Sequence, residues 1–453
     1  MRLWLSNRWG RLRDSFWFLP AIMVIGAIGL SFVTIRVDQA SEDQSWIAAL
    51  GWTFSRGPDG ARALLSTVAG SMITIASVTF SITIVALQLA STQFGPRLLR
   101  NYMRDRGNQV AIGAFVATFT YCILVLRTVN GTDAESFVPH LSVIVALLLS
   151  LTSLGILIYF VHHAAESIQA ENVIGDVSRE LHLAIDRLYP ERLGEQAPAQ
   201  TPASHIAGRR EWYRGDSYAI PSPVSDYLQS IDVDRLLNLA QRHDLVLTMT
   251  QRPGQFCIQD GPLLEASPRE RVDEALVEQL RECFYFGSRR TLTQDVEYAI
   301  NQLVEVAVRA LSPGVNDPFT AITCVDRLGA SLCVMVRREF PSPLRVDDQG
   351  ALRVVTTAST PAGIVDACFD QIRQASEGNI SLTIRVLEII AEVARVADDE
   401  QFLSSLSEQA EAVLRGSQRA AVDVADQRDI AARFSLVQNA LARRDIGRRS
   451  PHE

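Results

Sequence analysis

Residues 64–89 read LLSTVAGSMITIASVTFSITIVALQL, and the predicted fold depends on this stretch. It carries no charged side chain and is longer than the roughly 20 apolar residues with which a helix crosses a bilayer. At helical spacing, small and polar residues share one face of the predicted helix, and purely apolar residues share another. The small polar stripe is Thr67, Gly70, Thr74, Ser77, Ser81 and Gln88, and the apolar stripe is Ile75, Val78, Ile82, Val85 and Leu89. The sequence therefore predicts a membrane-spanning helix with two unlike faces.

The composition fits a membrane region joined to a larger soluble part. Hydrophobic residues make up 47% of the 453 residues, which is an average over an apolar N-terminal third and an ordinary soluble remainder. The net charge of -8 argues against nucleic-acid binding. The chain has no lysine, which excludes Schiff-base chemistry, and its six cysteines show no C-x-x-C spacing. That cysteine pattern favours reduced packing thiols over a disulfide framework or a zinc site, and we expect no cofactor.

Four apolar segments of the sequence are long enough to span a bilayer. They cover residues 16–35, 64–89, 110–126 and 138–161. A cleaved signal peptide is the alternative for the first segment, but that segment is long and no small-residue cleavage site follows it. We therefore expect a retained first span and a four-span transmembrane domain over residues 1–163.

The distribution of arginine predicts how these spans are oriented. Arginines cluster ahead of the first span, where Trp4, Trp9 and Trp17 also lie, and again directly after the second span. The loops after the first and third spans are acidic and carry few arginines. Under the positive-inside rule, both termini are then cytoplasmic. A re-entrant piece around residues 46–54 is the alternative that the first loop leaves open.

Downstream of the last span the pattern becomes that of a soluble chain. We expect residues 164–190 to extend the fourth span as a helix, and residues 191–215, in which Pro and Gly are mixed with Ala, Gln and Thr, to be a flexible linker. A small β-rich module over 216–268, a mainly helical domain over 269–446 and a tail over 447–453 follow. The predicted fold class is an α-helical polytopic membrane protein with a C-terminal mixed α/β, mainly helical, cytosolic domain. No internal repeat is evident.

Two of the predicted cytosolic helices meet at a polar corner between residues 312 and 318. Thr291 and Gln294 have the spacing of a capping box ahead of the first helix. Asp317, followed by Pro318, has the residue types of an N-cap and first turn for the second helix. The residues that we single out around this corner are Arg290, Asp295, Arg309, Ser312, Gly314, Asn316 and Asp317.

The corner has two interpretations. Because an open helix N-terminus near arginines can hold an anion, a small anionic ligand or a phosphate is one of them. The other, which we favour, is structural: Glu305 and Arg309 pair one helical turn apart, Asp317 caps a helix, and Gly314 shapes the turn.

No arrangement of residues in the sequence indicates catalysis. No Ser/His/Asp order, P-loop or H-E-x-x-H motif occurs. The adjacent His162 and His163 fit a membrane interface better than a metal site, since no carboxylate or Cys lies at metal spacing beside them. We therefore name no catalytic residue and no metal ligand.

Several motifs of the chain resemble one known family. Residues 77–81 read SVTFS, 86–91 read ALQLAS, 93–97 read QFGPR, 290–295 read RTLTQD and 309–318 read RALSPGVNDP. These motifs look like those of the bacterial predicted membrane proteins grouped as domain of unknown function 2254, and the resemblance covers nearly the whole chain. It implies an integral protein of the bacterial inner membrane and agrees with the four-span layout. It transfers no catalytic residue.

Two classes of function follow from these observations, with an enzyme third. In the first, copies of the chain form an oligomeric, channel-like conduit whose wet path is lined by the hydroxyl stripe and regulated by the cytosolic domain. In the second, the stripe is a small-residue packing seam and the protein is a membrane-anchored sensor or scaffold, which binds a small anionic ligand or a protein partner. Gln88 favours the conduit, because polar residues deep in a span are functional candidates. The expected partners are the lipid bilayer and further copies of the chain.

Overall fold

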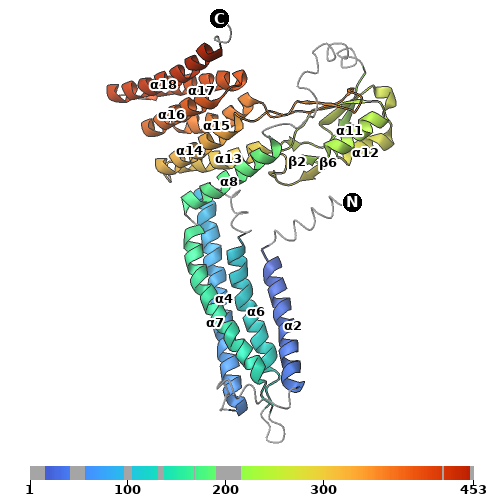
Figure 1. Cartoon of the computed structure of the whole chain (residues 1–453), viewed down its shortest axis with the longest axis vertical. Helices are drawn as coiled ribbons and strands as arrows, with labels where there is room; N and C mark the ends of the chain where they lie inside the picture. The colour runs from blue at the N-terminus through green and yellow to red at the C-terminus, as the bar shows by residue number, and fades with distance from the viewer. Residues whose placement is uncertain are drawn as a thin grey trace. The chain divides into compact units, whose positions relative to one another are not determined.

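The computed structural model describes residues 16–40, 57–95, 105–130, 137–167, 169–189, 216–420 and 423–448. Its contacts divide the chain into two units, Met1–Val173 and Ile174–Glu453. The first unit consists of long helices that run side by side (Figure 1). They are α2 (Phe18–Ala40), α4 (Gly57–Phe94), α6 (Arg106–Leu126) and α7 (His140–Ser167). The predicted linker over 191–215 and residues 449–453 of the predicted tail over 447–453 lie outside the described residues, whereas residues 447 and 448 belong to α18.

Helix α6 is the centre of the first unit. It packs against α2, α4 and α7. Of its most apolar stretch of 18 residues, 56% is buried, whereas the corresponding share is 28% or less in each of the other three helices. Its small residues permit this close packing: a Cβ atom added to Gly113 would lie 2.6 Å from the Met23 sulfur. The helix around which this unit is built is therefore the third apolar segment and not residues 64–89.

Helix α4 packs on the bundle through neither of its two predicted stripes. Its buried face is a third stripe, dominated by alanine and threonine, in which residues recur at steps of three and four as in helix–helix seams. This face leaves the hydroxyl stripe and most of the apolar stripe exposed on the outside of the unit. The buried residues are Ala61, Leu65, Ala69, Met72, Ala76, Thr79, Thr83, Ala86, Ala90 and Phe94.

The carboxylate of Asp38 joins the end of α2 to the start of α7. Its two oxygens accept hydrogen bonds from the backbone N–H groups of Leu141 and Ser142, at 2.9 and 3.0 Å, and from the Ser142 hydroxyl at 2.6 Å. The Tyr121 hydroxyl of α6 donates to the Ser142 carbonyl and lies 2.9 Å from the Thr34 hydroxyl of α2. Orphan N–H groups at a helix start need such partners, so a side chain from another helix completes α7.

Among the residues that the structure describes, five helices are long and apolar enough to cross a membrane, whereas the sequence analysis predicts four. The additional helix is α14 (Pro318–Met335), which belongs to the second unit. Its apolar character has an explanation in packing. The residues Ala321, Cys324, Val325, Leu328, Gly329, Ser331, Leu332 and Met335 are buried, and α14 contacts both α13 (Val296–Ala310) and α16 (Ile380–Val396).

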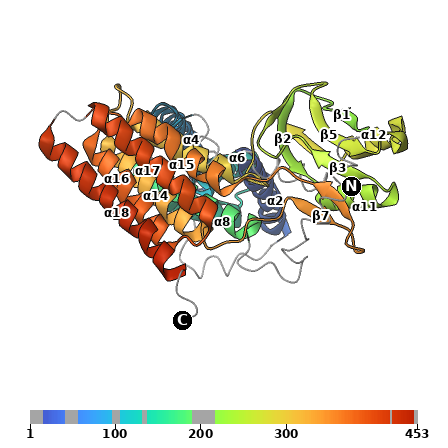
Figure 2. The same ribbon diagram turned by 90° about the horizontal axis from the view of Figure 1, so that it is seen from above.

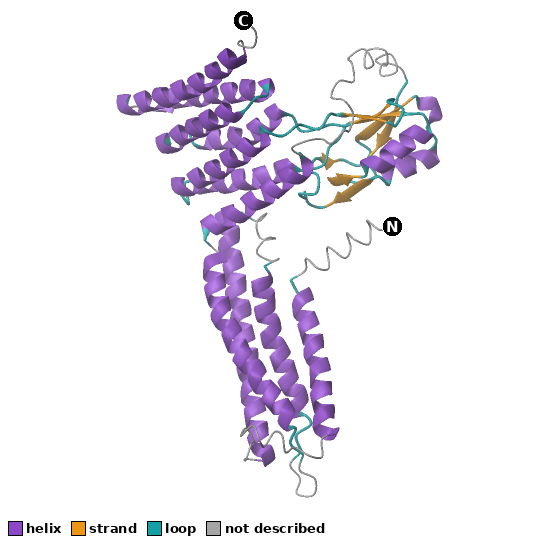
Figure 3. Cartoon of the chain, in the orientation of Figure 1, coloured by secondary structure: helices purple, strands orange, loops and turns teal. Residues whose placement is uncertain are grey.

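Two small sheets form one end of the second unit (Figure 3). The larger has the order β1-β5-β3-β8-β7, with one parallel pair, β3 and β8, and the smaller has the antiparallel order β4-β2-β6. The strands are β1 (Tyr218–Pro221), β2 (Asp226–Ile231), β3 (Val246–Met249), β4 (Phe256–Cys257), β5 (Pro262–Ser267), β6 (Phe284–Gly287), β7 (Leu344–Val346) and β8 (Leu352–Val355). Two short helices, α11 (Val233–Arg242) and α12 (Glu274–Arg281), follow β2 and β5.

The β-rich part extends beyond the predicted module over 216–268. Strand β6 follows that boundary, and β7 and β8 return to the sheet after α14, where Leu247 pairs with Val354. Ion pairs support this return: Arg353 of β8 lies 2.7 Å from Asp347 and 2.6 Å from Asp244. Arg353, with Arg271, holds the pKa of Asp244 below its usual value.

Stacked helix pairs form the remainder of the second unit (Figure 2). In one layer α13 contacts α15 (Pro361–Ala375), which contacts α17 (Glu400–Ala420), and in the other α14 contacts α16, which contacts α18 (Val424–Arg448). Each pair buries its apolar face on the next, as in helical repeat proteins. No repeat was evident in the sequence, because the pairs share a packing mode without shared motifs.

The local start signal predicted at Asp317 is confirmed, since Asp317 caps α14 with Pro318 in the first turn. Thr360 caps α15 in the same way, with Pro361 in the first turn. The capping box predicted at Thr291 is wrong. Asp295 caps α13, and the Gln294 side chain instead pairs with the backbone N–H and C=O of Ile231, at 2.8 and 3.0 Å.

Two glycines within helices provide a matched test of the packing of the second unit. A Cβ atom at Gly329 of α14 would lie 2.4 Å from Cγ2 of Ile389 in α16, whereas Gly175 of α8 (Ala170–Leu188) faces open space. We expect Gly329→Ala to destabilise the protein by about 1–3 kcal/mol through overpacking. Gly175→Ala should stabilise it by roughly 0.5–1 kcal/mol, because alanine favours the helix.

Thermal unfolding of the detergent-solubilised full chain measures both changes. A thiol-reactive dye suits this measurement, since Cys324 and Cys368 are buried in the folded protein. Equal shifts for the two variants would contradict the α14–α16 contact.

Candidate functional site

The residues predicted around the polar corner lie at opposite ends of α13. Arg290 and Asp295 are at its start, and Arg309, Ser312, Gly314, Asn316 and Asp317 follow its end. The 15 residues of α13 separate the two groups by about 22 Å at 1.5 Å per residue. The structure therefore does not bring the predicted residues together into one site.

At the start of α13, Asp295 is a buried carboxylate with a full set of partners. Arg290 donates to its two oxygens at 2.8 and 3.0 Å, and the backbone N–H of Tyr298 donates at 3.2 Å. Burial raises the pKa of Asp295, and the contact with Arg290 opposes that rise. A Cβ atom at Gly254 would lie 2.1 Å from Oδ2 of Asp295, so only glycine fits the loop that covers it.

At the other end of α13, the polar groups form a turn. Asp317 accepts from the backbone N–H of Thr320 at 3.1 Å and from its hydroxyl at 2.6 Å. Asn316 has a positive φ of 48°, a value that asparagine tolerates better than most residues. Arg309 lies 3.8 Å from Glu305 on its own helix. These contacts account for the corner as a helix-to-helix turn.

A cavity of about 180 Å³ lies beside the start of α13, between the sheets and the helix pairs. Chain segments distant in sequence line it: the end of α8, the end of β3 with the loop after it, β7, and the segment between β8 and α15. Its apolar wall comes from Leu188, Ile231, Val233, Met249, Pro253, Pro341 and Ala358. Its polar wall comes from Tyr189, Arg252, Gln294, Asp295, Arg345, Thr356, Thr357 and Ser359.

A bidentate ion pair joins two of these segments to α13. The Arg252 guanidinium donates to the two carboxylate oxygens of Glu297 at 2.5 and 2.9 Å and to the Ser359 hydroxyl at 2.6 Å. That hydroxyl in turn donates to Glu297 at 2.9 Å. Both charges are largely shielded from solvent, with side chains 26% and 13% exposed. Arg252 therefore contributes no uncompensated charge to the cavity.

Tyr189 follows the last turn of α8 and is nearly completely buried. Burial raises the pKa of its phenol to about 12, despite a hydrogen bond with Ser359 that lowers it. The ring packs on Phe340, with centroids 4.9 Å apart, and Phe340 packs on Phe402. Tyr189 is thus a neutral, fixed part of the cavity wall at physiological pH.

Arg345 of β7 differs from the other charged groups around the cavity. Its guanidinium donates to the carbonyls of Ser342 and Leu344, at 2.5 and 3.3 Å, and within the described part of the chain it forms no ion pair. Burial lowers its pKa, which reflects the cost of holding this cation away from water without a carboxylate. Arg345 is therefore a cation for which the cavity supplies no counter-charge.

Sequence reasoning found Arg290 and Asp295 beside this cavity but not Tyr189, Arg252 or Arg345. The sequence analysis named Asp295 only as a polar residue of the predicted corner and missed its role as the cap of α13. Tyr189, Arg252 and Arg345 have no local signal, and the meeting of Arg252 with Arg345 depends on the parallel pairing of β3 with β8.

The hydroxyl stripe of α4 faces away from the first unit, and its Gly70 and Gln88 are exposed as well. Thr67, Thr74, Ser77 and Ser81 each donate to the carbonyl four residues earlier, at 2.7–2.9 Å. Such bonds satisfy a hydroxyl within its own helix. The stripe is therefore compatible with lipid, with a second copy of the chain or with water.

The two histidines at the end of α7 have carboxylate partners, so the statement from the sequence that no carboxylate lies beside them is wrong. His163 lies 2.5 Å from Asp105, which also caps α6, and His162 lies 3.3 Å from Glu166. A Cβ atom at Gly107 would overlap the His163 ring, so glycine permits this contact. Among the described residues, no group of three or more His, Cys, Asp and Glu side chains is placed to hold a metal ion.

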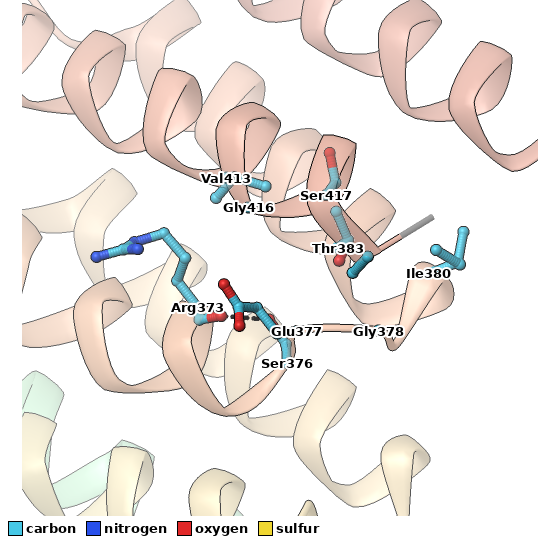
Figure 4. A pocket seen from close by; sticks show the side chains of 10 residues that line it. Arg373, Ser376, Glu377, Gly378, Ile380, Thr383, Val413, Gly416 and Ser417 are labelled. Carbon is cyan, nitrogen blue, oxygen red and sulfur yellow. Dashed lines mark hydrogen bonds between the residues drawn. The ribbon is translucent and has the colours of Figure 1, made fainter. Parts of the chain in front are cut away.

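A second hollow lies between the end of α15 and the last turns of α17 (Figure 4). Its volume of about 10 Å³ leaves room for one water molecule. Glu377 beside it is paired with Arg419 at 3.2 Å. The larger cavity is thus the better candidate for a ligand.

Comparison with known proteins places the chain in a family. A family model described as "Predicted membrane protein (DUF2254)" matches residues 13–392. The chain belongs to this family. Relatives named as uncharacterized proteins, from Mycobacterium bovis and Mycobacterium tuberculosis, are 31% identical over 421 residues, which cover 92% of this chain and 78% of each relative. No solved structure matches the chain.

The DUF2254 match includes both candidate regions. It begins ahead of α2 and ends within α16, so it contains the hydroxyl stripe of α4 and every residue that lines the cavity. As its description states, the family consists of predicted membrane proteins, which agrees with the apolar helices of this member.

Removal of each of the two capping aspartates tests their different surroundings. Asp317→Ala should cost about 0.5–2 kcal/mol, the usual cost of losing a cap. Asp295→Ala should cost more, roughly 3 kcal/mol or above, because Arg290 also loses its buried partner. Asp317→Asn is the control, since its amide oxygen can still accept from Thr320.

The melting temperature of the purified full chain ranks these variants. If Asp295→Ala were no more damaging than Asp317→Ala, the buried pair would be wrong. Loss of function in Asp317→Ala without any change in melting would instead favour a ligand at the 312–318 corner.

Proposed function

We propose that this protein is a membrane-anchored sensor of the bacterial inner membrane, whose cytoplasmic C-terminal unit binds a small anionic ligand. The observation that carries the proposal is the cavity beside α13, whose wall contains a cation with no counter-charge among the described residues. A concave site with a few polar groups and an apolar wall is the usual form of a ligand site. The sensor is thereby preferred to the conduit.

The proposed topology has four spans with both termini in the cytoplasm. Helices α2, α4, α6 and α7 are the proposed spans, and the arginine clusters flanking them support the orientation. We do not count α14 as a span, because its apolar residues are buried against neighbouring helices of the second unit.

Chain connectivity supports a link between the ligand and the membrane. Helix α7, the last proposed span, ends at Ser167, and α8 begins at Ala170. At its other end, α8 contributes Leu188 to the cavity wall. Tyr189, the next residue, also lines the cavity. A ligand in the cavity would touch the helix that continues from the last span.

Reporter fusions test the proposed topology. Fusions after residues 55, 100, 133 and 200 should report outside, inside, outside and inside. The acidic loops and arginine clusters give the physical reason. A cytoplasmic signal at 133 would contradict the four-span layout.

A cavity-filling variant tests the sensor itself. Ala358→Trp should occupy space at the cavity wall, so small anions that raise the melting temperature of the wild-type full chain should no longer do so. A ligand at 100 times its Kd stabilises a protein by about 2.7 kcal/mol, which a melting experiment resolves. If no small anion stabilised the wild type, or if filling the cavity had no effect, the sensor proposal would fail.

A second candidate is the oligomeric conduit, which one observation favours. The hydroxyl stripe of α4 is exposed on a single copy of the chain, as a stripe that faces other copies or a wet path must be. We expect membrane-impermeant thiol reagents to modify Ser77→Cys and Ser81→Cys in a cysteine-free background if a wet path exists.

Val85→Cys is the matched control, since Val85 is 57% exposed on the apolar stripe of the same helix. Equal and low reactivity at all three positions, together with no ion flux in liposomes, would rule out the conduit.

A further inference from the structure

We propose that the ligand of this cavity is a compact monocarboxylate with an apolar body, and that Arg345 pairs with its carboxylate. This inference rests on the proposed ligand-binding function and adds the chemical class of the ligand. It is carried by the charge balance, the free hydrogen-bond donors and the size of the cavity, which are taken in turn.

The charges around the cavity leave one cation uncompensated. Arg252 is paired with Glu297 through two hydrogen bonds, and Asp295 is paired with Arg290 through two more. Arg345 remains, and among the described residues its only hydrogen-bond partners are carbonyl oxygens. The balance is therefore one positive charge, which a monoanion neutralises and a dianion exceeds.

The hydrogen-bond donors of the cavity wall are almost all in use. The hydroxyl of Thr356 donates to the Pro343 carbonyl at 3.1 Å, that of Thr357 donates to the Met249 carbonyl at 2.8 Å, and that of Ser359 donates to Glu297. The amide of Gln294 is bound to Ile231. The guanidinium of Arg345, which uses one of its nitrogens for the two carbonyls, keeps donors available for a ligand.

These two facts favour a carboxylate over a phosphate. A phosphate monoester carries nearly two charges at neutral pH and three strong acceptor oxygens. The cavity offers one free cation, so a second negative charge on the ligand would have no partner there. An arginine fork matches the two oxygens of one carboxylate.

The volume and the apolar wall define the rest of the ligand. A cavity of 150 Å³ holds benzene, and this one, at about 180 Å³, has space for a ring or branched chain of similar size plus a carboxylate. Leu188, Ile231 and Val233 supply part of the apolar surface against which that body would pack. Benzoate is a suitable probe of this class.

The test is calorimetric titration of the purified full-length protein in detergent with matched probes. Benzoate should bind at least tenfold more tightly than benzamide, which has the same shape and no charge. Acetate should bind more weakly because it leaves the apolar wall uncovered, and 2-naphthoate should bind more weakly because it exceeds the cavity. Phenyl phosphate and inorganic phosphate should also bind more weakly than benzoate.

Variants then assign the charge to one residue. Arg345→Gln should weaken benzoate binding at least tenfold while leaving the weak benzamide binding unchanged, and Arg345→Lys should restore part of the loss. Arg415→Gln is the matched control, because Arg415 is an exposed arginine on α17 paired only with Glu411 within the described residues. It should bind benzoate as the wild type does.

The failure of this inference is distinct from the failure of the sensor. Equal affinities for benzoate and benzamide, tighter binding of phenyl phosphate, absence of benzoate binding, or no effect of Arg345→Gln would each overturn the monocarboxylate. If another small anion still stabilised the wild type but not Ala358→Trp, the sensor would stand without this ligand class. If no small anion stabilised the wild type, the sensor proposal and the monocarboxylate proposal would both be wrong.

Discussion

The ion pair between Arg252 and Glu297 is the interaction on which the rest of the second unit depends. It joins the loop after β3 to α13 and, through Ser359, to the segment ahead of α15, so that the sheets and the helix pairs share one polar junction. By neutralising Arg252, it also leaves Arg345 as the cation of the cavity that lacks a counter-charge. A buried pair of this kind adds little net stability, but its loss leaves an uncompensated charge and is costly.

The first unit follows a related constraint, since polar groups inside a membrane need partners within the protein. Asp38 satisfies the first N–H groups of α7, and the hydroxyls of α4 donate to carbonyls of their own helix. The hydroxyls of the stripe that looked functional in the sequence therefore already have hydrogen-bond acceptors within their own helix. This observation moves the candidate site away from the spans and toward the cavity at the end of α8.

Local signals in the sequence predicted much of the fold. The apolar segments and the cap at Asp317 each depend on neighbouring residues. Long-range contacts could not be predicted from the sequence. The pairing of Leu247 with Val354 brings Arg345 to the cavity, and no residue near it in the sequence indicates this pairing. The packing face of α4 was missed because its alanines are less conspicuous than the hydroxyls on the exposed side. The predicted corner failed as one site because α13 separates its two halves.

The central claim is that a ligand in the cavity contacts the end of the helix that continues from the last proposed span. Hydrogen–deuterium exchange of the full-length protein, with and without saturating benzoate, tests it most directly. The account predicts slower exchange at the end of α8 and over residues 341–359, which line the cavity, with α18 unchanged. Unchanged exchange at the end of α8 under conditions where benzoate binds would contradict the claim.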